Sequence, residues 1–329
     1  MKKGMGLFLA FLLVLGLTAC SEQGQSTEKK SSDHQKTAEK SSTKTANQVF
    51  PVTIKDAAGK QVTLKEKPKR IVSLIPSDTE ITFALGAGKR VVGVSKFDNY
   101  PKAVQSIAKI GGIDFNIEKI ISLKPDLVLA YATQIKNKAA GLNQLRKAGI
   151  PVLVVNESSN FEDVYHSINM IAKATGTRKK ASEIINHMKD SFAKIKKKAA
   201  SIPNDQRVKV YVEISAPPNI YTAGSGTFVN QMLNLLNAKN IAASEKGWPK
   251  YSSEKVVKQD PDVIVLTYGA FTKNAVQKVL NRSGWQNVNA VQNKRVYNVD
   301  GDLVTRPGPR LVKGVEQLAH AIYPNVYTK

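Results

Sequence analysis

The sequence predicts an α/β protein of two similar lobes joined by one long, rigid helix, with a ligand cleft between the lobes. Three observations lead to this prediction. Short apolar strands alternate with helical segments in both halves of the chain, a motif of the first half returns in the second, and an unbroken amphipathic stretch lies between the halves. With 329 residues, the chain is long enough for two domains.

The first half begins with a predicted hairpin. Val52–Asp56 and Gln61–Leu64 flank a turn, and Arg70–Ile75 has the composition of a buried strand. Ser77 has Glu80 three residues later, which is capping-box spacing, so we expect a helix with Ser77 as its N-cap. Further strands are expected at 91–94, 127–130 and 152–155, with a helix near 134–148. This alternation is typical of a mostly parallel sheet.

The middle of the chain predicts one long helix over residues 178–200. Its apolar residues follow each other in helical steps: Ala181, Ile184, Ile185, Met188, Phe192, Ile195 and Ala199. At 1.5 Å per residue the helix is a rod of roughly 35 Å. A surface helix of one lobe would show the same pattern, but the mid-chain position favours a connector. We therefore place the N-terminal lobe at 49–177 and the C-terminal lobe at 201–329.

The second half repeats the build of the first. Strands are expected at 207–213, 263–267 and 295–299, with helices at 226–236, 272–280 and 309–322. The segment 118–129 also returns at 254–265, with a constant offset of 136. Each copy has Glu-Lys followed by two aliphatic residues, three further residues, Pro-Asp and an apolar strand. Two lobes of similar build leave a cleft, the usual place for a small ligand.

The N-terminus has the features of an export signal. Two lysines precede an apolar run of eleven residues, Leu7–Leu17, which is too short to span a bilayer. Leu17–Cys20 resembles the lipobox of bacterial lipoproteins. The resemblance implies a signal peptide at 1–19 and a lipid on Cys20. An ordinary secretory signal is the alternative. Residues 20–48 are almost free of apolar side chains beyond the cysteine, so we expect a disordered tether.

Composition excludes several functions. The formal net charge is +23, but an exported chain without basic blocks and interleaved aromatic residues is not expected to bind nucleic acid. Cys20 is the only cysteine, which excludes an internal disulfide or a cysteine-based zinc site. The sequence carries neither a nucleophile elbow nor a phosphate loop, and its four histidines include no His-x-x-x-His pair. We therefore expect a binding protein without a resident cofactor or metal, and not an enzyme.

Three features together resemble one family. The run Arg70–Glu80, the strand Val91–Ser95 and the paired Pro-Asp motifs are similar to the helical-backbone substrate-binding proteins of ABC importers, over about residues 50–329. The family implies two Rossmann-like lobes, joined by a helix that limits their closure. It also implies a monomer held by its lipid on the extracytoplasmic face of the cell membrane, in a Gram-positive bacterium. Its partners are an ABC permease homodimer and the ATPase of that permease.

The resemblance also assigns roles to residues. In this family one glutamate on each lobe docks into arginine pockets of the two-fold permease, and by motif these are Glu118 and Glu254. A glutamate favoured by the dipole of its own helix is the alternative. For the cleft, the pattern of the cobalamin-binding members maps onto Phe97, Tyr221, Trp248, Asp302 and Arg306, with the last two in a loop after the last strand. Each aromatic residue, taken alone, also fits plain packing.

One departure concerns the ligand. Cobalamin-binding members have a further cleft tryptophan where this chain has Gly112, and a Gly-Gly pair there is common in siderophore binders. Cobalamin is the predicted ligand, and a ferric siderophore or haem is the alternative. A siderophore requires cations, for which Arg306 and Arg310 are candidates, and haem requires an axial ligand such as Tyr221 or Tyr268. A sensor or adhesin without a transport role is the third possibility.

Overall fold

The N-terminal lobe is organised around a parallel five-stranded sheet. The structure, a computed structural model, describes residues 50–327. The strand order is β5-β4-β3-β6-β7, and all neighbours are parallel. The strands are β3 (Ile71–Ser73), β4 (Val91–Val94), β5 (Ala108–Lys109), β6 (Leu127–Tyr131) and β7 (Val152–Val155). The apolar runs that predicted strands are therefore sheet strands, buried on both faces.

An antiparallel hairpin and four helices surround this sheet. The hairpin pairs β1 (Val52–Lys55) with β2 (Gln61–Leu64), as the sequence predicts. The helices are α1 (Pro76–Ala84), α2 (Ile117–Ser122), α3 (Thr133–Lys147) and α4 (Phe161–Thr175). The sequence reasoning did not identify α4, although the side chain of Asn160 caps it by accepting a hydrogen bond from the backbone of Asp163.

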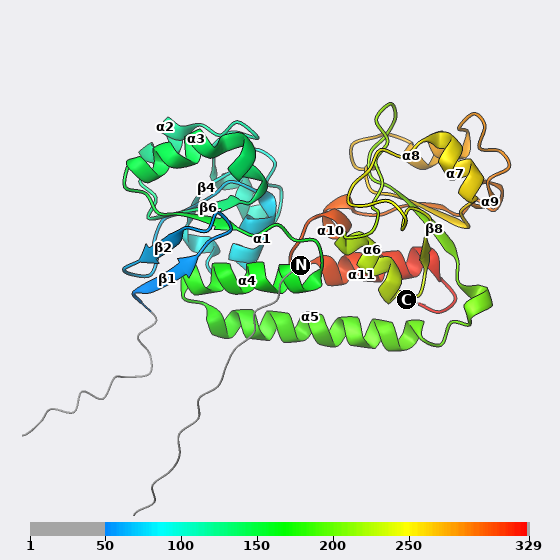
Figure 1. The fold of residues 1–329 in the computed structure, drawn as a ribbon, viewed down its shortest axis with the longest axis horizontal. Coiled ribbons are helices and arrows are strands. Elements are labelled where there is room, and N and C mark those ends of the chain that lie inside the picture. The colour runs from blue at the N-terminus through cyan, green and yellow to red at the C-terminus, as the bar shows by residue number, and fades with distance from the viewer. Residues whose placement is uncertain (1–49, 328–329) are drawn as a thin grey trace, which may run out of the picture. The chain divides into compact units, whose positions relative to one another are not determined.

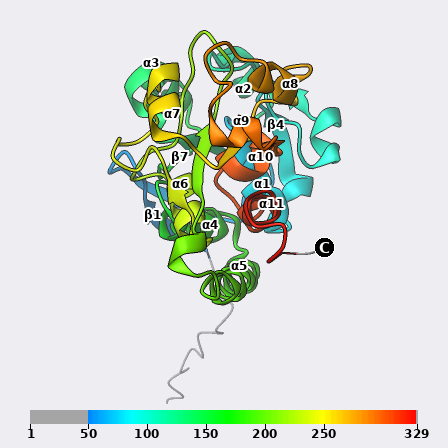
Figure 2. The same ribbon diagram turned by 90° about the vertical axis from the view of Figure 1, so that its right-hand side faces the viewer.

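The long helix α5 (Arg178–Ala199) packs against both lobes. It lies beside α4 of the first lobe and beside α6 (Phe228–Leu235) and α11 (Leu311–Ile322) of the second (Figures 1 and 2). The predicted face is the one that α5 buries, with Ile184 and Ile195 only partly covered. Phe192 of this face stacks on Phe161 with 4.3 Å between ring centroids. One hydrophobic core therefore continues from lobe to lobe along α5.

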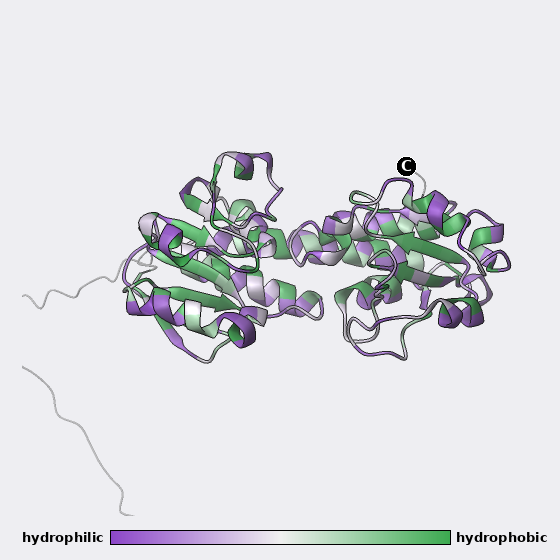
Figure 3. Ribbon diagram, turned by 90° about the horizontal axis from the view of Figure 1, so that it is seen from above, coloured by the Kyte–Doolittle hydropathy of each residue, from purple (hydrophilic) through white to green (hydrophobic). Residues whose placement is uncertain are grey.

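The C-terminal lobe has a smaller parallel sheet with the order β11-β10-β8-β9. Its strands are β8 (Lys209–Glu213), β9 (Lys239–Asn240), β10 (Val263–Leu266) and β11 (Val296–Asn298). Besides α6 and α11, its helices are α7 (Ser253–Gln259), α8 (Ala275–Leu280), α9 (Asn289–Gln292) and α10 (Gly301–Thr305). Figure 3 shows hydrophobic strands inside and polar helix faces outside in both lobes. The predicted two-lobe α/β fold with a connecting helix is confirmed.

Two local predictions are wrong. Ser77 is not an N-cap, because it lies inside α1. The helix begins at Pro76, whose fixed φ suits a first helical turn, and Ile75 is the N-cap residue. Glu80 therefore does not close a capping box. The segment after β11, predicted as a loop, forms the short helix α10, which the side chain of Asp300 caps by accepting from the backbone nitrogen of Asp302 (2.9 Å).

Candidate functional site

A pocket of about 360 Å³ lies between the two lobes. In the first lobe its walls are residues that follow the carboxyl ends of parallel strands, where α/β folds usually bind ligands. The second lobe contributes the start of α6, the Trp248 loop and α10. The lining residues are Ile75, Pro76, Ser77, Tyr131, Glu157, Ser158, Phe228, Trp248, Asp302, Thr305, Arg306 and Pro307. Three of the five predicted ligand residues, Trp248, Asp302 and Arg306, therefore lie together.

Trp248 supplies the aromatic wall of this pocket. Its loop is held against segment 221–225 by backbone hydrogen bonds, including Gly224 N to Gly247 O at 2.8 Å. The indole meets the ring of Phe228 edge-on at 5.8 Å, yet 41% of Trp248 stays exposed. A supported but uncovered indole face is suited to stacking on a flat ligand.

Phe97 lines a neighbouring pocket of about 170 Å³, which shares Ile75 and Pro76 with the first. Gly112 lines the same pocket. A Cβ on Gly112 would lie 2.5 Å from Lys96 Cε and 3.1 Å from Phe97 Cε2. The end of the Lys96 side chain thus occupies the space next to Gly112, and Phe97 provides the aromatic surface on this side of the site.

Tyr221 is the one predicted ligand residue that lines neither pocket. It pairs with Lys250 in an isolated antiparallel bridge, and Lys250 Nζ lies 6.0 Å from the centre of its ring. Its place in the segment that supports the Trp248 loop makes it a neighbour of the site.

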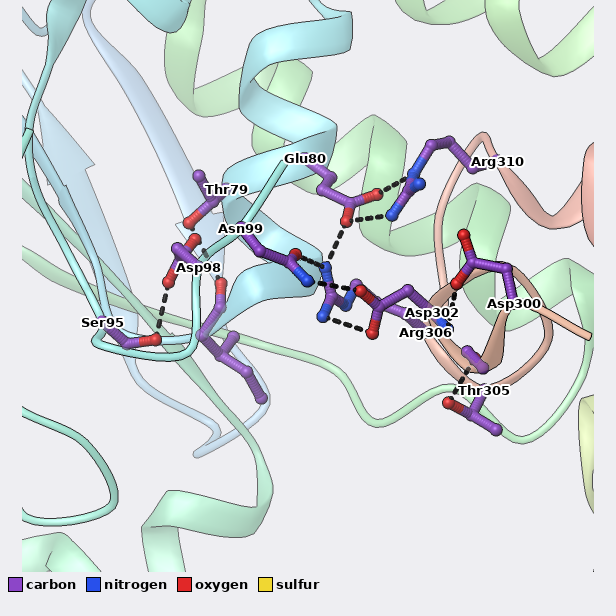
Figure 4. Close-up of polar contacts among 12 residues, drawn as sticks. Thr79, Glu80, Ser95, Asp98, Asn99, Asp300, Asp302, Thr305, Arg306 and Arg310 are labelled. Atoms are coloured by element: carbon purple, nitrogen blue, oxygen red, sulfur yellow. Dashed lines mark hydrogen bonds and ion pairs between the residues drawn. The ribbon is translucent and has the colours of Figure 1, made fainter. Parts of the chain in front are cut away.

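Arg306 and Asp302 belong to a polar network that joins the lobes (Figure 4). Glu80 of α1 accepts from Arg306 Nη1 at 2.5 Å and from Arg310 through two bonds of 2.7 Å. Arg306 also donates to Asp302 (2.7 Å) and to Asn99 (2.9 Å), and Asn99 donates to Asp302 (2.6 Å). The side chain of Glu80 is only 3% exposed. We call these five residues the interlobe network.

The interlobe network neutralises the two arginines that the sequence offers as anion ligands. Arg306 and Arg310 both pair with the buried carboxylate of Glu80, and Asp302 adds a second carboxylate beside Arg306. The lining residues of the pocket include one arginine, Arg306, and two carboxylates, those of Glu157 and Asp302. The pocket with Trp248 is therefore not a cationic one.

Sequence reasoning missed Tyr131 and Ser158. Tyr131 is the last residue of β6, and its hydroxyl oxygen accepts a hydrogen bond from the backbone nitrogen of Ser158 at 3.0 Å. Burial raises the pKa of Tyr131 to about 12. The signal that could have identified both residues is their position, directly at or after the carboxyl end of a predicted strand.

The haem candidate Tyr268 lies in another environment. Its hydroxyl donates to Glu213 Oε1 at 2.5 Å, and Arg282 forms two bonds of 2.7 Å with the same carboxylate. Tyr268 is 8% exposed and packs in the C-terminal core. It therefore supports the fold of this lobe rather than the pocket.

Asp78 is a buried acid directly behind the pocket, next to the lining residue Ser77. Burial raises the pKa of Asp78 well above its usual range, and within residues 50–327 its Oδ2 has no hydrogen-bond partner. Between its unfolded pKa of about 3.9 and its higher folded pKa, the folded state binds more protons. The contribution of Asp78 to the free energy of unfolding therefore falls as pH rises through this interval.

We expect Asp78→Asn to remove this contribution, so that the stability of the wild type relative to the variant falls from pH 4 towards neutral pH. Urea unfolding of both proteins across this range measures the difference. The control is Asp190→Asn on the exposed side of α5. Its free energy of unfolding should keep a constant difference from that of the wild type across this pH range. A constant difference between wild type and Asp78→Asn would contradict the prediction.

The structure places Glu118 and Glu254 in the first turns of α2 and α7, on the side of each lobe away from α5 (Figure 1). Both are exposed, and neither forms an ion pair within the described residues. The backbone nitrogen of Glu254 and the side chain of Ser252 lower the pKa of Glu254, so its charge is retained at neutral pH. Cys20, the signal peptide and the tether lie outside the described residues.

The sequence profile of the periplasmic binding protein family matches residues 71–303. The chain belongs to this family. A further relative is the uncharacterized ABC transporter substrate-binding lipoprotein YvrC of Bacillus subtilis, which is 48% identical over 99% of both chains. This chain is thus an ABC transporter substrate-binding protein. Among residues 50–327, no helix is long and apolar enough to cross a bilayer, and no three His, Cys, Asp or Glu side chains group as metal ligands.

Other relatives of this periplasmic binding protein differ in what their names say they bind. A cobalamin-binding protein of Halobacterium salinarum is 33% identical over 83% of this chain and 74% of its own length. A solved structure from Staphylococcus epidermidis, described as a possible iron-binding periplasmic solute-binding protein, is 38% identical. It aligns with a TM-score of 0.69 over 78% of this chain and all of its own.

Proposed function

We propose that this protein captures cobalamin on the extracytoplasmic face of the membrane and delivers it to an ABC permease dimer with its ATPase. The observation that carries the proposal is the charge of the cleft. An exposed tryptophan face shares its pocket with Arg306, which the carboxylates of Glu80 and Asp302 already neutralise. The 33% identity to a cobalamin-binding protein supports the same ligand.

The chemistry of cobalamin fits this cleft. Its corrin ring offers a broad apolar face, and neutral amides surround its rim. Trp248 and Phe97 give aromatic surface in the two adjoining pockets, and Gln134 and Asn137 beside Phe97 give amide partners. A ferric siderophore with several negative charges needs unpaired cations instead, because buried charge is costly without a partner. The pocket with Trp248 has more carboxylates than arginines among its lining residues.

Haem fits less well because of the axial ligand that it needs. Within the described residues the pocket with Trp248 has neither histidine nor methionine in its lining, and its tyrosine is Tyr131. Tyrosine binds haem iron as phenolate, whereas burial raises the pKa of Tyr131 to about 12 and opposes that form.

Iron uptake is the second candidate function. The likeness to the staphylococcal protein, described as possibly iron-binding, favours it, as does the glycine pair at positions 111–112. A ferric siderophore or haem would then be the ligand, and Lys96, whose Nζ lies 5.2 Å from the centre of the Phe97 ring, is a candidate cation outside the interlobe network. Titration with cyanocobalamin, ferric siderophores and haem separates the two candidate functions.

Cyanocobalamin is expected to bind the purified body, residues 48–329, and to quench its tryptophan fluorescence. The chain has two tryptophans, and Trp285 is fully buried, so the exposed Trp248 should supply the quenched signal. Trp248→Ala should weaken binding at least about tenfold, because a stacking aromatic face is lost. Calorimetry with cyanocobalamin, ferric siderophores and haem measures each affinity.

Phe271→Ala is the matched control, since Phe271 is 85% exposed and lines neither cleft pocket. Its affinity should equal that of the wild type. Tight binding of a siderophore or haem without any response to cyanocobalamin would overturn the cobalamin proposal. Undiminished affinity of Trp248→Ala would remove Trp248 from the site.

We expect Cys20 to carry the lipid that holds the protein at the membrane. The lipobox-like segment Leu17–Cys20 and the similarity to a substrate-binding lipoprotein support this. Cys20→Ala should move the protein from the membrane fraction to the soluble fraction, because the substitution removes the lipid that holds the exported chain at the membrane. Fractionation with immunoblotting measures the shift, and retention at the membrane would contradict it.

A further inference from the structure

Arg306 brings a positive charge to the pocket with Trp248. Within residues 50–327 its guanidinium donates three hydrogen bonds. Nη1 donates to Glu80 at 2.5 Å and to Asn99 at 2.9 Å, and Nη2 donates to Asp302 at 2.7 Å. An arginine has five N–H donors, so these bonds leave two for an acceptor in the pocket. A ligand therefore meets a hydrogen-bond donor whose charge the protein has already balanced.

Glu80 balances this charge from outside the pocket with Trp248. It is not a lining residue of that pocket. Together with Arg310 it borders a separate cavity of about 450 Å³, which shares no lining residue with the pocket with Trp248. Only 3% of the Glu80 side chain is exposed. Glu80 can therefore act on a ligand through Arg306 and not by direct contact.

The charges of the interlobe network sum to zero. Arg306 and Arg310 are positive, Glu80 and Asp302 are negative, and Asn99 is uncharged. Figure 4 shows the carboxylate of Glu80 bonded to both guanidinium groups, and its Oε1 accepts from each of them. Removing the charge of Glu80 therefore leaves an excess positive charge next to the pocket with Trp248.

Burial makes this balance important for the choice of ligand. The Arg306 side chain is 14% exposed, and charges that water screens poorly interact strongly. An anionic group in the pocket would meet the carboxylates of Glu80 and Asp302 together with the guanidinium. It would lose its hydration without gaining an unpaired cation. Binding sites often reject competitors by repulsion of this kind. An amide carbonyl can instead accept from Arg306 without bringing a charge.

We propose that Glu80 is a specificity-determining residue, which makes this site select uncharged ligands over anionic ones. It holds Arg306 in a neutral pair, so a carboxylate that the ligand does not touch decides the charge class of the ligand. The inference rests on the proposed function and names the residue that sets its selectivity. Asp302 acts in the same direction from the pocket itself, where 26% of its side chain is exposed.

The test compares two ligands that differ by one charge. Cyanocobalamin is neutral overall, and each of its monocarboxylic acid derivatives has a carboxylate in place of one amide. Calorimetry with the purified protein measures the affinity for cyanocobalamin and for each acid isomer, and the selectivity is the ratio of the two affinities. The wild type should bind cyanocobalamin at least about tenfold more tightly than the least favoured isomer. Glu80→Gln should lower this ratio at least about tenfold.

Two further variants separate the charge of Glu80 from its structural role. The double variant Glu80→Gln with Arg310→Gln returns the charge of the network to zero and should restore the wild-type ratio. Glu213→Gln is the matched control, because Glu213 is also fully buried and binds Arg282 through two bonds of 2.7 Å. Glu213 lines neither cleft pocket, so the ratio of this variant should stay within about twofold of the wild type.

An equal loss of affinity for both ligands in Glu80→Gln, with an unchanged ratio, would overturn the inference, because a purely structural role gives that result. A double variant that keeps the altered ratio would overturn it as well. If Glu80→Gln does not fold, Asp302→Asn takes its place and should lower the ratio in the same direction.

A failure of the proposed function gives a different result. If cyanocobalamin does not bind the wild type, the proposed ligand is wrong, and the ratio is measured with an uncharged and an anionic ferric siderophore. The same changes of the ratio are then expected in the variants. Tighter binding of the anionic siderophore by the wild type would overturn the role of Glu80.

Discussion

Replacing Glu80 with alanine is expected to lower the free energy of unfolding by about 3–5 kcal/mol, the cost of leaving buried charges without their partner. Glu80 is the more deeply buried of the two acids in the interlobe network and binds both Arg306 and Arg310. The side chains of these arginines are 14% and 16% exposed, so water replaces little of the lost interaction. Urea unfolding of the body, residues 48–329, gives the value.

The matched control is Glu66→Gln. Glu66 also pairs with a basic residue, Lys69, at 3.6 Å, but both side chains are more than three quarters exposed. Glu66→Gln should change the free energy of unfolding by no more than about 0.5 kcal/mol. A Glu80→Ala protein as stable as the control would show that the network does not hold the lobes. If Glu80→Ala does not fold, Asn99→Ala takes its place. This variant removes only the bonds to Arg306 and Asp302, so its loss of unfolding free energy should be smaller but measurable.

The double variant Glu118→Gln with Glu254→Gln is expected to reduce uptake by cells at least about a hundredfold and to leave ligand affinity unchanged. Truncating one partner of a desolvated charge pair costs about 2–5 kcal/mol at an interface, and here two such pairs are lost. Neither glutamate lines the pocket with Trp248 or the adjoining pocket with Phe97. The measurements are uptake of labelled cyanocobalamin and calorimetry with the same ligand.

Glu183→Gln provides the control for transport. Glu183 is an exposed glutamate of α5, where it pairs with Lys180. Uptake by this variant should equal that of the wild type, since α5 lies on the opposite side of the lobes from α2 and α7 (Figure 1). Normal uptake by the double glutamine variant, or a loss of its ligand affinity, would contradict the assignment.

The candidate site was only partly predictable. Trp248, Asp302 and Arg306 line one pocket as the resemblance implied, and Phe97 lines its neighbour. Tyr131 and Ser158 were not predicted, because their residue types match no binding motif and only their position at or after the carboxyl end of a predicted strand marks them. They become lining residues only when parallel strands bring their carboxyl ends together.

Glu80 shows why local patterns mislead. Glu80 lies three residues after Ser77, a spacing that fits a capping box but also arises by chance. The proline before Ser77 starts the helix earlier, and the arginines that bind Glu80 lie 226 and 230 positions further along the chain. Contacts over such distances leave no periodic signal, so sequence reasoning had no means to find them.

Local sequence patterns predict the alternation of strands and helices, the long helix α5 and the repeat that produces α2 and α7. These follow from short-range physics, since apolar periodicity, capping and turn residues act within a few positions. The charge of the pocket with Trp248, in contrast, depends on contacts between residues far apart in the chain. Arg306 is a free cation in the sequence and a neutralised one in the fold, because burial between the lobes requires every charge to have a partner, and Glu80 and Asp302 provide it.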